Sequence, residues 1–152
     1  MSYSIKFKDV ATAIAAFSVS GVTIQNLTTI PENTTLAGPT LFPNSNFVTN
    51  MQVTRATFGT AGAERIDIEY DLNYIYTHCA IGSGVGSFAP YSAMIDKIIL
   101  MQLAFMNNDN VRDGTSLTFG TIGNIGAVTD AAGNSYWGCS ITAHVLEFSE
   151  VA

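Results

Sequence analysis

The clearest pattern along the chain is a strict alternation of apolar and polar positions between Ile66 and Cys79. One face of this segment carries Ile66, Ile68, Tyr70, Leu72, Tyr74 and Tyr76, and the other carries Asp67, Glu69, Asp71 and Asn73. Successive side chains of a β-strand point to opposite faces, so a period of two predicts a long strand with one buried face. A run rich in threonine and valine, Phe47–Phe58, precedes it across a turn at residues 59–62. The two runs together predict a β-hairpin.

A first helix is predicted from about Ile5 to Phe17. Ser4 is placed to cap it, and Val10 and Ile14 fall with Phe17 on one face. Four alanines in the same segment favour the helical conformation. The short segment Val22–Leu27, which follows, alternates as a strand does.

A second helical segment, Tyr91–Met106, has an unusually wide apolar arc, and Pro90 is well placed for its first turn. Its main face consists of Met94, Ile98, Met101 and Phe105, with Ile95, Ile99 and Leu103 beside them. The arc is wider than packing against one sheet requires. We therefore expect Met94, Met101 and Phe105 to contribute to a subunit contact, while a place in the core explains the methionines equally well.

Further strands are predicted at 116–121, 125–129 and 136–148. The order of helix, strands, helix, strands is typical of the α+β class. The expected architecture is a mostly antiparallel sheet packed by one long and one short helix. Neither an internal repeat nor a linker divides the chain, so residues 1–152 are interpreted as one domain.

The stretch from Thr28 to Asn46 has neither period and holds Pro31, Pro39 and Pro43. Loops of this length in small domains usually bind something or reach a neighbour. In Pro39-Thr-Leu-Phe-Pro43, the prolines pre-set an extended backbone around Leu41 and Phe42. We expect an extended proline-rich arm on which Pro39, Leu41, Phe42 and Pro43 contact another subunit or a partner.

Composition supports assembly with other subunits. Apolar residues make up 47% of the chain and charged residues 12%, where about a quarter is usual in soluble domains. The longest apolar run, Ile98–Leu103, is interrupted by Gln102 and is far shorter than the roughly twenty residues that cross a bilayer, so no membrane partner is expected. Burial between subunits is then the simplest outlet for this apolar surface. The net charge of −6 and six scattered basic residues also argue against tight nucleic-acid binding.

Candidate catalytic or metal-binding groups are few. Asp67, Glu69 and Asp71 lie about 6.6 Å apart along one strand face and could share a cation, but no histidine or fourth carboxylate is evident nearby. A solvated strand face explains them better. A calcium loop at residues 107–120 lacks its closing glutamate, and the glycines at 82, 84 and 86 lack the lysine of a phosphate-binding loop. We predict no catalytic residue, metal or cofactor.

The two cysteines and two histidines give no nucleophile–base pair. Cys79 and Cys139 are expected to be free thiols, although one disulfide is possible. His78 adjoins Cys79 and in a regular strand points to the other face. His144 with Cys139 would need a carboxylate supplied by the fold. Satisfied strand histidines are the simpler interpretation.

In the order of its elements the chain resembles the tail terminator (tail-completion) proteins of long-tailed bacteriophages. The resemblance covers nearly the whole chain through short motifs. These are Gly21-Val-Thr23 after the first helix, the arm from Ile30-Pro31 to Pro43, the strand Tyr70-Asp-Leu-Asn-Tyr-Ile-Tyr76, and Asp130-Ala-Ala-Gly-Asn-Ser-Tyr-Trp-Gly138 before the last strand. It implies a structural virion subunit of the tail and neck, assembled in the host cytoplasm, that forms a hexameric ring, ends tail-tube growth and joins the tail to the head.

The resemblance also implies partners: further copies of the chain, the tail tube protein, a head-completion or neck protein, and DNA that passes through the lumen without tight binding. By position, Pro31–Pro43 and Gly82–Gly86 would be contact elements, and Asp67, Glu69 and Asp71 could line the channel. Another neck or tail-tube subunit is the nearest alternative. A small-molecule or sugar-binding module that uses Tyr70, Tyr74, Tyr76 and Trp137 belongs to a different class, and a hydrolase is the third interpretation.

Overall fold

The computed structural model describes residues 7–27, 38–58, 63–81, 89–108, 115–129 and 133–151. Its elements, in chain order, are α1 (Phe7–Ala15), β1 (Thr23–Ile24), β2 (Thr40–Phe58), β3 (Ala63–Ala80), α2 (Tyr91–Asn107), β4 (Thr115–Thr129) and β5 (Ser135–Val151). The predicted mixture of helices and a sheet is confirmed.

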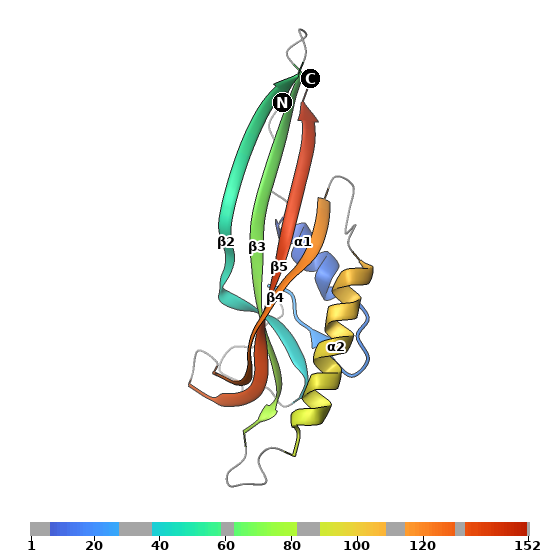
Figure 1. Ribbon diagram of the computed structural model, residues 1–152, viewed down its shortest axis with the longest axis vertical. Coiled ribbons are helices and arrows are strands. Elements are labelled where there is room, and N and C mark those ends of the chain that lie inside the picture. Colours follow the sequence, from blue (N-terminus) through green and yellow to red (C-terminus); the bar gives the residue numbers. More distant parts are fainter. Residues whose placement is uncertain are drawn as a thin grey trace.

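The strands form one sheet in the order β1-β2-β3-β5-β4. β1 pairs in parallel with the start of β2, and all other neighbours are antiparallel. Figure 1 shows a long twisted sheet in which β2, β3 and β5 extend well beyond the level of the helices. The predicted hairpin is confirmed, with Val53 opposite Ile68 and Thr54 opposite Asp67.

Both helices pack on the same face of the sheet. The apolar residues of β3 on this face are buried in one cluster with Val10 and Ile14 of α1 and with Met94 and Met101 of α2. The partners of β3 in β5 complete this face: Val145 lies opposite Tyr70, Ala143 opposite Leu72, and Ile141 opposite Tyr74. We call it the helix-covered face.

Aromatic rings fill the middle of this core. The ring of Tyr74 meets Phe47 edge-on with centroids 5.2 Å apart and Phe105 of α2 with centroids 6.3 Å apart. Phe105 in turn contacts Phe17 at 5.5 Å. Such edge-to-face pairs add about 0.5–1.5 kcal/mol each to the burial of the rings. They tie α2 and the chain after α1 to β2 and β3.

The expected arm differs from the structure in its second half. Residues 28–37 lie outside the described part of the chain, but β2 begins at Thr40, within the stretch that was predicted to have no regular structure. Proline is tolerated in edge strands and at bulges. Both conditions hold for Pro43, because β1 pairs only with Thr40 and Leu41 and the β2–β3 register is irregular after Pro43. Two strands predicted at 116–121 and 125–129 are likewise one strand, β4, with irregular register at two points.

Candidate functional site

The face of the sheet opposite the helices, here called the helix-free face, is mostly polar, with Phe148 of β5 exposed on it opposite Asp67. In β3, Asp67, Glu69 and Asp71 alternate with the buried residues Ile68 and Tyr70, so the carboxylates point away from the core as predicted. In β5, Thr142 and His144 lie on this face opposite Asn73 and Asp71. In β4, Ser116 and Thr118 continue it as exposed side chains opposite Leu146 and His144.

A hydrogen-bonded row crosses this face from β2 to β5. The side-chain amide of Asn50 donates to Asp71 Oδ2 at 2.9 Å, and His144 Nδ1 lies 2.9 Å from Asp71 Oδ1. His144 Nε2 also lies 3.9 Å from a carboxylate oxygen of Glu69. The prediction that no histidine stands near the acidic residues is therefore wrong. The β3–β5 register brings together positions 73 residues apart, and no local pattern signals such a contact.

The row changes the acidity of its central carboxyl group. Burial raises the pKa of Asp71, while hydrogen bonds from Asn50 and His144 and the charge of His144 lower it. The lowering effects prevail, and the pKa of Asp71 lies below its ordinary value of 3.8. The surroundings of Asp71 on this face therefore stabilise its ionised form.

A second row of hydrogen bonds lies next to the first. The amide of Asn73 donates to Thr49 Oγ1 at 2.8 Å and to the carbonyl oxygen of Asn46 at 3.0 Å. The hydroxyl of Thr142 donates to Asn73 Oδ1 at 3.1 Å. Asn73 therefore connects the side chains of three strands. In the described part of the chain, no group of three or more histidine, cysteine, aspartate or glutamate side chains is arranged to hold a metal ion.

The residues predicted to form an exposed apolar arm are mostly inside the molecule. Leu41 is fully buried and lies opposite Tyr76, and Pro43 is buried opposite Tyr74. Phe42 and Pro39 are half-buried. Leu41 is therefore not presented on the surface of the folded chain, because parallel pairing of Leu41 with Ile24 of β1 draws this part of the chain into the sheet.

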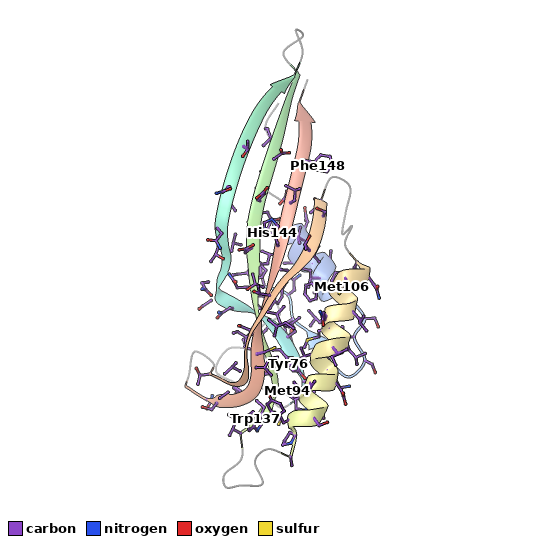
Figure 2. All side chains as sticks on the ribbon, viewed as in Figure 1. Tyr76, Met94, Met106, Trp137, His144 and Phe148 are labelled. Carbon is purple, nitrogen blue, oxygen red and sulfur yellow. The ribbon has the colours of Figure 1, made fainter. Side chains whose placement is uncertain are left out.

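The predicted contact residues of α2 are also core residues. Met94, Met101 and Phe105 are buried against the sheet, which agrees with the core position considered for the methionines and leaves these side chains off the surface of the folded chain. The exposed apolar side of the helix consists instead of Ile99 (48% exposed), Leu100 (38%), Leu103 (48%) and Met106 (58%), which we call the α2 ridge. The sequence did show that the arc was too wide for one sheet, but its periodicity could not say which side faced the sheet. Met94 lies between helix and sheet in Figure 2, whereas Met106 lies near the other end of α2.

The aromatic residues considered for sugar binding form no open platform. Tyr70, Tyr74 and Tyr76 are buried, and Trp137 is nearly so, with its ring edge-on to Tyr91 at 5.8 Å. Figure 2 shows Tyr76 and Trp137 at the lower end of the sheet, beside the start of α2. Stacking of a sugar requires an accessible ring face, so this arrangement does not support the sugar-binding interpretation.

The thiols and His78 are not arranged for nucleophilic catalysis. Both cysteines are free, as expected, with Cys139 buried and Cys79 half-buried. Burial raises the pKa of the Cys139 thiol to about 12 and raises that of Cys79 as well, which keeps both protonated near neutral pH. His78 Nδ1 lies 2.7 Å from the hydroxyl of Tyr76. Burial and the charge of Lys97 lower the pKa of His78, so this ring is held neutral.

Sequence reasoning missed one buried acid. Glu147 of β5 is fully buried on the helix-covered face, where it accepts a hydrogen bond from the hydroxyl of Tyr70. Its position in an alternating strand could have indicated an inward orientation. The glycine-rich segment at 82–86, predicted as a contact element, lies outside the described residues.

Comparisons with known proteins give no family. No protein-family model matches the sequence, and no curated protein matches it. Among the described helices, none has the length and apolar character needed to cross a membrane.

Proposed function

We propose that the chain is a structural subunit of a bacteriophage tail that forms a ring at its head-proximal end, ends growth of the tail tube and joins the tail to the head. In this proposal residues 1–152 form one α+β domain with a short helix, a long helix and a proline-rich segment at 28–39. The resemblance in element order supports it. The observation that carries it is the helix-free face, a broad and mostly polar surface backed by a buried apolar core.

The helix-free face suits the wall of a channel for DNA. Its described charged side chains are Asp67, Glu69 and Asp71, together with His144, which is held by Asp71. Threonine, serine and asparagine occupy much of the remainder. A protein must offer cations to neutralise phosphates before it holds duplex DNA. A wall made mainly of hydroxyl, amide and carboxylate groups, with Phe148 as its exposed apolar side chain opposite Asp67, offers DNA no cation that would retain it.

The α2 ridge supplies the apolar surface that an assembly subunit needs. Four large apolar side chains are exposed along one helix, and α2 has only two charged residues, Asp96 and Lys97. Scattered exposed apolar residues are ordinary, but a continuous row along a helix is typical of a protein–protein contact. We assign it to the contact between neighbouring subunits.

Another neck or tail-tube subunit is the second candidate, because it would use the same polar wall and the same ridge. The two candidate functions predict different tails in a phage that lacks the protein. Without a terminator, tails grow to uncontrolled, excessive lengths and full heads remain unattached. Without a tube subunit, tails are short or absent.

The test is electron microscopy of lysates from a phage with an early nonsense codon in this gene. We expect overlong tails and tailless full heads, and rescue by the wild-type gene supplied in trans. The variant Leu103→Ser should fail to rescue, while Ala93→Ser, an exposed change on the same helix, should succeed. Tails of normal length joined to heads in the nonsense mutant would refute the proposal, and short tails would replace it by the second candidate.

A further inference from the structure

The outer strands of the sheet carry almost none of the charged side chains that keep open edges from pairing, although both have points of irregular register. Monomeric sheets protect their edges with charged side chains, with proline or with bulges. β4 contains no charged residue and no proline over its 15 residues. From Phe47 to Phe58, β2 contains one charged residue, Arg55, and no proline. The inner strand β3 holds the charged residues Glu64, Arg65, Asp67, Glu69 and Asp71. This distribution is the reverse of the one expected for a sheet whose edges face solvent.

Both edges are open among the described residues. β1 pairs with Thr40 and Leu41, so the other 17 of the 19 residues of β2 have no described strand on that side. Of the strands in the described ranges, β4 is the last in the sheet and pairs with β5 alone. The backbone groups of roughly alternate residues point outward along each edge and need hydrogen-bond partners, which another strand supplies in full.

We propose that β4 of one copy pairs with β2 of the next, so that the sheet continues across the subunit boundary. This inference rests on the proposed ring and identifies the contact that builds it. Because β2, β3, β5 and β4 alternate in direction, β4 runs antiparallel to β2 within one copy. Copies related by rotation about an axis along the strands keep these directions. The strand next to β4 is then an antiparallel β2, and the ladder continues unchanged.

A second copy fits these edges better than a foreign strand does. The two open edges have matching lengths, 15 residues in β4 and 17 in β2, and both are almost uncharged. One head-to-tail contact uses both edges of every copy, and closure of the ring leaves no edge open. A two-fold contact of β4 with β4, or of β2 with β2, would leave the other edge of each copy exposed.

The α2 ridge adjoins this contact. α2 packs on β4 and lies on the β4 side of the sheet, and only the start of β2 runs near α2 in the same copy (Figure 1). A neighbour docked on the β4 edge would therefore reach the ridge as well. Backbone pairing and apolar burial would then occur on the same side of the molecule, which agrees with the assignment of the ridge to the subunit contact.

The register irregularities of each strand limit where pairing is regular. β4 pairs evenly with β5 from Thr115 to Phe119, and β2 pairs evenly with β3 from Gln52 to Phe58. Both stretches lie toward the same end of the sheet, since Ser116, Leu146, Glu69 and Gln52 occupy one row across it. Closure of a sheet into a barrel requires a stagger between strands, so the neighbour is displaced from this row by some residues along the strand direction.

Cysteine cross-linking with a short bismaleimide tests the contact. Ser116→Cys or Thr118→Cys in β4 is combined with Gln52→Cys or Thr54→Cys in β2. The four resulting double variants test different staggers between β4 of one copy and β2 of the next. All four positions are exposed on the helix-free face. At least one double variant should give a ladder of covalent multimers. Each single variant should give no cross-link with itself, and a mixture of two single variants should give a dimer only. Wild type, whose thiols are buried or half-buried, is the control.

Two further measurements distinguish a failure of edge pairing from a failure of assembly. Light scattering gives the mass of the assembly, and hydrogen exchange reports the protection of the backbone amides. In the assembled protein, amides at 52–58 and 115–119 should become protected relative to a dilute sample. If the protein assembles but no pair cross-links and these amides stay unprotected, edge pairing is wrong and the ring stands. Cross-links of single variants with themselves would establish a two-fold contact instead. A protein that remains monomeric at high concentration overturns the edge pairing, and the nonsense-mutant phage then decides the proposed function separately.

Discussion

The two faces of the sheet are made by the same strands, yet different forces hold them. On the helix-covered face, buried aromatic and aliphatic side chains pack against α1 and α2. On the helix-free face, hydrogen bonds link side chains of neighbouring strands, as in the row Asn50–Asp71–His144. Burial of apolar area contributes most of the stability of a domain, whereas exposed polar contacts contribute little each. The first face therefore determines whether the chain folds, and the second is available for function.

The largest loss of unfolding free energy is expected when a buried methionine of α2, on the side that faces the sheet, is truncated. Met101 is fully buried and Met106 is 58% exposed on the same helix. Met101→Ala should reduce the free energy of unfolding by about 2–5 kcal/mol, because it removes buried area and leaves a cavity. Met106→Ala should change it by less than about 0.5 kcal/mol. Urea denaturation of both variants measures the difference, and equal losses would mean that the ridge is packed within the single chain.

A smaller effect is expected where the helix-free face is tightly built. A methyl group added at Gly138 of β5 would lie 1.8 Å from the carbonyl oxygen of Tyr76, a backbone atom that cannot move without separating β3 from β5. Gly138→Ala should therefore cost about 1–3 kcal/mol, as overpacking does. At Gly38 a methyl group would meet no atom within 4 Å, so Gly38→Ala is the control. An unfolding midpoint for Gly138→Ala equal to that of the control would show that the two strands separate easily at this point.

The sequence predicted those parts of this picture that depend on local pattern. The alternation in β3 gave the correct hairpin and the correct orientation of Asp67, Glu69 and Asp71. It could not give the contact of His144 with Asp71, because the register of strands far apart in the chain is fixed by the packing of the whole sheet. It also misplaced Leu41, since prolines indicate an irregular segment and the structure accommodates Pro43 at an irregular edge.

The face of α2 illustrates a further limit. Apolar residues occupy both sides of this helix, so several rotations about its axis place an equally apolar side on the sheet. Met94, Met101 and Phe105 face the core because they pack against the side chains of the sheet. One example is the ring of Tyr74, which contacts Phe105. Such a choice depends on shapes that no period in the sequence describes.

The smallest effect is expected from the charge at the centre of the helix-free face. Because the pKa of Asp71 lies below its ordinary value of 3.8 in the folded chain, the ionised carboxylate stabilises the fold. This contribution is complete above the unfolded pKa and is lost as the pH falls through the folded pKa. A partly exposed ion pair such as Asp71–His144 contributes about 0.2–1 kcal/mol to the free energy of unfolding.

Asp71→Asn should therefore show a smaller loss of unfolding free energy than wild type when the pH is lowered from about 5 to about 3. His144→Gln should reduce the same loss in part, because the hydrogen bond from Asn50 to Asp71 remains. Urea titrations at the two pH values measure these differences. Equal losses in wild type and Asp71→Asn would show that the row holds its geometry without stabilising charge, and the helix-free face would then differ from the covered face in composition alone.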